Sequence, residues 1–234
     1  FKRNFVMSKS SFYTSIGYKI LMALSGLFLM IFLLQHLSIN MLSVISPDTF
    51  NEASHFMGTN PLVQFLLQPV LMFAVIFHFV MGFVLELKNR NARSVDYAFK
   101  NPSTSSSWMS RNMIISGLTV LAFLVLHFVD FWIPEINTKY VVGDMTGLMA
   151  DGNYRYFHEL RHEFQSLPRV IAYLVAFIFL ALHLQHGFKS SFQSVGLTNG
   201  NKRLALLKFG NLFAIVVPLG FVVVALFHFL TQSH

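Results

Sequence analysis

Four histidines lie inside long apolar stretches of this 234-residue sequence, and imidazole is a side chain that both ligates metals and transfers protons. They are His36, His78, His127 and His183, one in each of four successive stretches. A polar ring in such surroundings costs free energy unless it has a partner. One histidine of this kind is equally well explained by a hydrogen bond to a neighbouring segment. Four of them, one per stretch, indicate a shared ligand.

The stretches that must position these histidines are long enough to cross a membrane. They and a fifth one cover residues 17–43, 62–87, 111–133, 167–190 and 205–230. Each has roughly 20–27 residues, which at about 1.5 Å per residue spans ~30 Å of hydrocarbon. Only 12% of the residues are charged and 54% are apolar, whereas a soluble domain carries about 25% charged residues. We therefore expect a single domain over 1–234, an all-α membrane protein of five transmembrane helices.

The positions of the basic residues predict the orientation of these helices. Thirteen of the 17 Lys and Arg residues fall in segments 1–19, 88–111 and 189–208, which alternation of the spans puts on one side. The positive-inside rule then places the N-terminus in the cytoplasm and the C-terminus outside. Topology and lipid contact thus explain the net charge of +7, and no nucleic-acid partner is expected.

The segments outside the spans offer few further signals. Residues 154–164 alternate apolar and charged residues at helical spacing, which predicts a short amphipathic helix on the outer membrane surface. Residues 1–15 lack the apolar core of a cleavable signal peptide. A start at Met7 and a trimmed N-terminus both fit the opening Phe1. No internal repeat is evident in the five stretches.

The four span histidines sort into two levels when each is placed by its distance from the middle of its span. His36 and His127 lie ~9 Å and ~7 Å toward the outside, while His78 and His183 lie ~5 Å and ~6 Å toward the inside. Two histidines from different helices can fill both axial positions of a haem iron. The sequence therefore predicts an outer haem held by His36 and His127 and an inner haem held by His78 and His183.

Other chemistries fit less well or stay open. The absence of cysteine excludes iron–sulfur ligation and covalent haem attachment by this chain. Zinc needs four ligands at one point, which two separate levels do not supply. A relay of bare, proton-carrying histidines is an open alternative. His186 lies one turn after His183 and can replace it as a ligand, whereas His228 is expected at the membrane interface.

Four short motifs occur in order along the chain: Gln35-His36-Leu37-Ser38-Ile39-Asn40, Phe77-His78-Phe79 with Gly82, Leu126-His127-Phe128 with Phe131-Trp132, and His183-Leu184-Gln185-His186-Gly187 followed by Ser190 to Gly196. Each is weak by itself, but the ordered set covers nearly the whole chain. Together the motifs resemble the di-haem cytochrome b membrane anchor of succinate:quinone oxidoreductases (succinate dehydrogenase or fumarate reductase), of the single-chain, five-helix type.

The resemblance implies more than the spacing does. It implies that the same four histidines are the haem ligands, with His183 chosen over His186 because the family ligand precedes a glycine, here Gly187, by four positions. It implies a bacterial inner-membrane location and a quinone, menaquinone for this type, near the outer haem. Some family members carry a glutamate for proton transfer two positions before the fourth ligand. Here that residue is Ala181, so a proton path of that kind is not expected.

The resemblance also implies partners, since the anchor itself carries no dicarboxylate chemistry. A flavoprotein with covalent FAD and an iron–sulfur subunit would sit on the cytoplasmic face, and the whole complex can form a dimer. The expected function is electron transfer between the iron–sulfur subunit and a membrane quinone. The alternatives are a di-haem cytochrome b of a hydrogenase or formate dehydrogenase, and a non-redox, proton-coupled transporter.

Further residues are candidates for the quinone and the haem propionates. Asp130, Gln68 and Asn40 lie toward the outer ends of their spans; a carboxylate such as Asp130 can take a quinol proton. An ordinary interfacial charge and a helix–helix contact explain Asp130 and Asn40 as well. The propionate candidates lie toward the cytoplasmic ends, where the positive-inside rule also places basic residues: Lys19, Ser25, Arg111 and Lys189.

Overall fold

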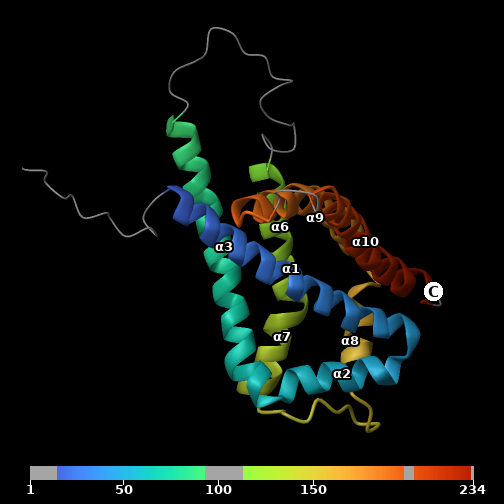
Figure 1. The fold of residues 1–234 in the computed structure, drawn as a ribbon. Helices are drawn as coiled ribbons and strands as arrows, with labels where there is room; N and C mark the ends of the chain where they lie inside the picture. Colours follow the sequence, from blue (N-terminus) through green and yellow to red (C-terminus); the bar gives the residue numbers. More distant parts are fainter. Residues whose placement is uncertain (1–14, 93–112, 198–202, 233–234) are drawn as a thin grey trace, which may run out of the picture.

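Five long helices make up most of the chain in a computed structural model, which describes residues 15–92, 113–197 and 203–232 (Figure 1). They are α1 (Ser15–Ile45), α3 (Gln68–Ala92), α6 (Met113–His127), α9 (Leu167–Ser194) and α10 (Arg203–Leu230). Five helical segments are long and apolar enough to cross a membrane: Ile16–Ile45, Val63–Arg90, Met113–Val142, Leu167–Ser194 and Arg203–Leu230. The prediction of an all-α, multi-pass membrane protein with five spans is confirmed, whereas its orientation stays a prediction.

The third span is longer than the predicted 111–133. Helix α6 runs on through η3 (Phe128–Trp132), α7 (Ile133–Ile136) and η4 (Asn137–Val142). Glu135 and Lys139 suggest a loop because both are charged, but their side chains pair one turn apart at 2.5 Å. Oppositely charged side chains at this spacing support a helix, so the charges do not end it. The segments η2 (Val63–Leu67), η3 and η4 are π-helical turns.

Four of the long helices form a closed ring. Helix α1 packs on α3, α3 on α6, α6 on α9 and α9 on α1, while α10 packs against α9 and α1 outside the ring. Helices α1 and α6 are therefore opposite each other across the bundle, as are α3 and α9. Between 11% and 39% of the residues in the apolar windows of the spans are buried inside the protein. Most of the apolar surface thus faces outward, where lipid would cover it.

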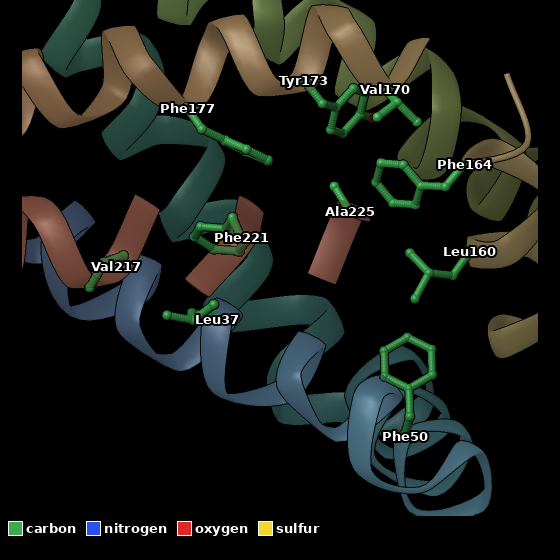
Figure 2. Close-up of a cluster of buried hydrophobic side chains, with 10 residues drawn as sticks. All are labelled: Leu37, Phe50, Leu160, Phe164, Val170, Tyr173, Phe177, Val217, Phe221 and Ala225. Atoms are coloured by element: carbon green, nitrogen blue, oxygen red, sulfur yellow. The ribbon is translucent and has the colours of Figure 1, made fainter. Parts of the chain in front are cut away.

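Two short helices close one end of this bundle. Helices α2 (Pro47–Thr59) and α8 (Tyr156–Glu163) lie against each other there (Figure 1). Figure 2 shows the core that joins them to the long helices: Leu37, Phe50, Leu160, Phe164, Val170, Tyr173, Phe177, Val217, Phe221 and Ala225. Helix α8 falls inside the segment predicted to be amphipathic, and its buried Leu160 packs into this core.

Buried ion pairs connect this end of the bundle to α7. The Lys139 ammonium donates to the Gly58 carbonyl in α2 and pairs with Glu135. Arg155, which precedes α8, pairs with the same Glu135 and, at 2.6 Å, with Glu159. Partial burial alone would lower the pKa of Arg155, but its hydrogen bonds to Glu159 and Glu135 outweigh burial and raise it. The charges at this end are therefore paired, as burial requires.

Candidate functional site

The four span histidines meet in two pairs, each across one diagonal of the bundle. The ring centroids of His36 on α1 and His127 on α6 lie 5.7 Å apart, with an angle of 82° between the ring planes. The centroids of His78 on α3 and His183 on α9 lie 6.3 Å apart at 73°. The structure therefore brings together the same residues that the sequence places at the same level. Of His183 and His186, it is His183 whose ring faces His78.

Both pairs have the separation expected for one metal ion between two imidazole nitrogens. Two metal–nitrogen bonds of about 2 Å, together with the distance from each nitrogen to its ring centre, place two centroids about 6 Å apart. No group of three or more His, Asp or Glu side chains gathers at one point within residues 15–92, 113–197 and 203–232. A haem iron needs only two axial ligands from the protein, whereas a structural zinc takes four. Each opposed pair could supply the two axial ligands that a haem iron takes from a protein.

Phenylalanine rings surround the outer pair, His36 and His127. Phe32 stacks on the His36 ring at 5.4 Å and 17°, and Phe123 stacks on His127 at 5.8 Å and 27°. Phe221 of α10 lies 5.8 Å from His36. Each stacking ring comes four residues before its histidine, which places the two on the same helix face. These rings restrict the imidazoles and keep water away from them.

Serine hydroxyls contact the inner pair, His78 and His183. The Oγ of Ser25 on α1 lies 3.0 Å from Nδ1 of His78, and the Oγ of Ser116 on α6 lies 3.4 Å from Nδ1 of His183. Each hydroxyl also donates, at 2.9 Å, to a carbonyl three residues earlier in its own helix. Ser25 is one of the propionate candidates, and its hydroxyl contacts the Met22 carbonyl and the His78 ring. Ser116 is a site residue that the spacing of the histidines does not predict.

These serines belong to an internal repeat, so the expectation of no repeat is wrong. The pattern Met-x-x-Ser-Gly-Leu-x-x-x-x-Phe-Leu-x-x-His occurs at residues 22–36 and again at 113–127. A second pattern, His-x-x-x-Gly, occurs at 78–82 and 183–187. Helices α1 and α3 thus repeat as α6 and α9, which are their opposite neighbours across the ring. A search for repeated spacing around the histidines would have found Ser116.

The other propionate candidates lie at the ends of their helices. Lys19 is exposed near the start of α1. Lys189 is exposed near the end of α9, where it lines a cleft of about 170 Å³ together with Gln185 and Asn211. Arg111 lies outside the described residues. The structure therefore leaves Lys19 and Lys189 accessible but gives neither a contact with the inner histidines.

Asp130 is buried next to the outer histidine pair and is not an exposed interfacial charge. Its side chain is fully covered, and the Tyr173 hydroxyl donates to its Oδ2 at 2.7 Å. The Arg169 guanidinium lies 3.3 Å from Oδ1 and also pairs with Glu163. The Tyr173 ring lies 6.4 Å from that of His127. Asp130 belongs to the π-helical turn η3, a feature that is frequent at functional sites.

The two remaining quinone candidates, Asn40 and Gln68, differ in their surroundings. A further histidine, His228, lies close to Asn40 through Ser43. The Asn40 amide donates to the His36 carbonyl at 2.8 Å and lies 3.4 Å from Nε2 of the same residue. Gln68 is half-buried at the start of α3. His228, in the last turn of α10, is fully buried within the protein, and its expected position at the membrane interface stays a prediction. Its Nε2 lies 2.8 Å from the Oγ of Ser43, whose hydroxyl donates to the Asn40 carbonyl.

The fold and these contacts define the chain as a five-span, all-α membrane protein with two pairs of opposed histidines inside a four-helix ring. Comparisons with protein-family models, with curated proteins and with solved structures gave no significant match. The assignment of a function therefore depends on the geometry of the site.

Proposed function

We propose that this chain is the membrane anchor and electron-transfer subunit of a succinate:quinone oxidoreductase. In this proposal it carries electrons between an iron–sulfur subunit and a membrane quinone. The observation that supports it most is the meeting of four span histidines as two opposed pairs, one on each diagonal of the bundle. His36 and His127 would hold an outer b haem, and His78 and His183 an inner one.

The chain's own residues would bind, orient and insulate these groups. Two b haems, when bound, supply one-electron carriers at two depths of the membrane. The two histidine pairs would hold the two irons, and side-chain contacts restrict the orientation of the imidazole rings. Phe32, Phe123 and Phe221 exclude water from the outer pair. Exclusion of water lowers the local dielectric response and thereby helps set the reduction potential.

The outer end of the bundle offers the groups that a quinone needs. Reduction of a quinone takes up two protons, and its reverse releases them, so a proton acceptor must be close. Asp130 is the carboxylate nearest in sequence to an outer ligand, and Tyr173 and Arg169 hold it in place. Asn40 and Gln68 remain candidates for hydrogen bonds to the quinone oxygens. Menaquinone is the quinone that the resemblance implies.

The proposed partners would bind at the opposite end. The described basic side chains Lys88, Arg90 and Lys189 lie at the ends of α3 and α9, on the side predicted to be cytoplasmic. There they would face a flavoprotein with FAD and an iron–sulfur subunit at the surface of a bacterial inner membrane. Association of two whole complexes is part of the same proposal.

A reduced-minus-oxidised visible spectrum of the purified chain tests the proposal. We expect the bands of a b-type cytochrome and two haems per chain. A fully loaded preparation without such bands would refute the proposal and favour a proton-coupled transporter, which predicts no colour. Identification of the subunits that purify with the chain distinguishes a succinate:quinone oxidoreductase from a hydrogenase or formate dehydrogenase.

Single histidine variants test the pairing. We expect His36→Ala to lose the outer haem and His78→Ala the inner haem, so that each variant keeps one of two. His186→Ala is the matched control, because this half-buried residue lies one turn from His183 on the same helix and should keep both. Equal loss of both haems from each variant, with the helical content unchanged, would contradict the pairing.

A further inference from the structure

We propose that Ser25 and Ser116 are positioning residues that hold both axial histidines of the inner haem in one tautomer, with the proton on Nδ1 and Nε2 free for the iron. This inference rests on the proposed function and extends it to two residues that touch neither the iron nor the quinone. It also predicts that the two haems differ in a measurable way.

A serine hydroxyl has a single proton to donate. Ser25 and Ser116 each donate this proton to a carbonyl three residues earlier, at 2.9 Å. The oxygen can then only accept from its second neighbour, which is Nδ1 of His78 or His183. A neutral imidazole carries its proton on one nitrogen, and the other nitrogen keeps a lone pair. Both serines therefore favour a protonated Nδ1 and leave Nε2 as the ligand atom.

A glycine follows each serine, and at Gly26 the missing side chain leaves room for the close approach of the His78 ring. A Cβ added at Gly26 would lie 3.3 Å from Cε1 of His78, and one added at Gly117 would lie 3.7 Å from Cε1 of His183. The contact at Gly26 is tighter than ordinary van der Waals distance. In each Ser-Gly pair the serine supplies the hydroxyl that contacts Nδ1, and the glycine has no side chain between its helix and the imidazole ring. Its occurrence in both copies of the repeat makes a chance contact a poor explanation.

The outer pair does not share this arrangement. Nδ1 of His127 is buried and has no hydrogen-bond partner in the described part of the chain. A hydrogen bond accepted from Nδ1–H makes an imidazole more electron-donating, which stabilises the oxidised iron. The serine contacts should therefore lower the potential of the inner haem and leave that of the outer haem unchanged.

Redox titration of the purified chain tests this, with the two haems followed by their spectra. We expect Ser25→Ala and Ser116→Ala each to raise the potential of the inner haem, and the double variant to raise it further. Loss of such a second contact around a metal ligand typically weakens affinity by about 10–100-fold, so the double variant should also release the inner haem more readily. Both single variants act on the same haem, although their serines lie on different helices.

Three further variants separate positioning from packing. Ser25→Thr keeps a hydroxyl and should restore the wild-type potential. Ser25→Cys keeps the volume but is a weak acceptor, so it should give an intermediate shift even if alanine impairs folding. Ser38→Ala is the matched control on the same helix, because within the described part of the chain this exposed hydroxyl bonds only to the carbonyl of Leu34, at 2.9 Å. It should leave both potentials unchanged.

The outcomes separate this inference from the proposed function. A wild-type chain without b-type haem would refute the proposed function and the inference with it. A wild-type chain with two haems, whose inner potential does not respond to Ser25→Ala or Ser116→Ala, would overturn the inference alone. An equal shift of both haems would also overturn it.

Discussion

The hydrogen bond between Tyr173 and Asp130 allows a quantitative test of the end of the bundle that α2 and α8 close. Tyr173→Phe removes a hydroxyl that donates at 2.7 Å to a carboxylate whose side chain is 0% exposed. A hydrogen bond to a charged group contributes about 1.5–3 kcal/mol. Arg169 does not replace it fully, because its side chain is 31% exposed and lies 3.3 Å from the other oxygen. We expect Tyr173→Phe to lower the free energy of unfolding by about 1.5–3 kcal/mol.

A double-mutant cycle with Asp130→Asn isolates this interaction. The asparagine keeps the shape of the side chain but not its charge, so the phenol loses most of its partner. The double variant should be less destabilised than the sum of the single variants, by about 1 kcal/mol or more. The free energies are measured by unfolding in mixed detergent micelles, followed by circular dichroism. Tyr140→Phe is the control, since Tyr140 is 51% exposed and should change stability by less than about 0.5 kcal/mol.

Two results would refute this reasoning. Additive effects of Tyr173→Phe and Asp130→Asn would mean that the two side chains do not interact. A change for Tyr173→Phe as small as that of the Tyr140 control would mean that the buried carboxylate does not depend on the phenol.

Two predictions concern the loop before α8 and its first residue. Gly147→Ala should lower the melting temperature of the protein more than Gly152→Ala does. Both glycines have positive φ, which costs about 1–2 kcal/mol in alanine. Of the two, only Gly147 would place the new Cβ against the Tyr156 hydroxyl, at 2.7 Å. Equal melting temperatures would contradict this. Burial raises the pKa of Tyr156 to about 12 from 10.0, so the unfolded chain loses this proton first as pH rises. Stability should therefore be full below pH 10 and fall toward pH 12, and Tyr156→Phe should flatten this fall; an unchanged pH profile would argue against it.

The pairing of the histidines could be predicted because the membrane makes a buried imidazole costly. His36, His78, His127 and His183 stand out against apolar neighbours, and a rise of about 1.5 Å per residue suffices to place them at two levels. Ser116 gives no such signal, since serine is tolerated in membrane helices and its partner lies 67 residues away. Only its position in the repeat marks it.

At the end of the bundle that α2 and α8 close, several groups that look solvated in the sequence are paired in the structure. Lys139 and Glu135 suggest a loop, yet they neutralise each other inside a helix. His228 is fully buried, and Ser43 lies within hydrogen-bond distance of its ring. Asp130 has two partners, which come from a different helix.

Helix α2 (Pro47–Thr59) begins at a local signal that fits a turn as well as a helix. Ser46 accepts a hydrogen bond from the backbone N–H of Thr49, and Pro47 occupies the first turn of the helix. A capping serine followed by proline begins a helix as readily as it forms a turn. The polar composition after Pro47 hid this helix, because only a few of its residues, such as Phe50, are buried.

The repeat has a consequence for how either site can be assembled. His36 and His78 belong to the first copy, and His127 and His183 to the second. Each copy therefore supplies half of each pair and completes neither. The chain has the construction of two similar two-helix units joined covalently, with each histidine pair formed between the units. Fragments separated between residues 92 and 113 would have to associate before a single pair could form.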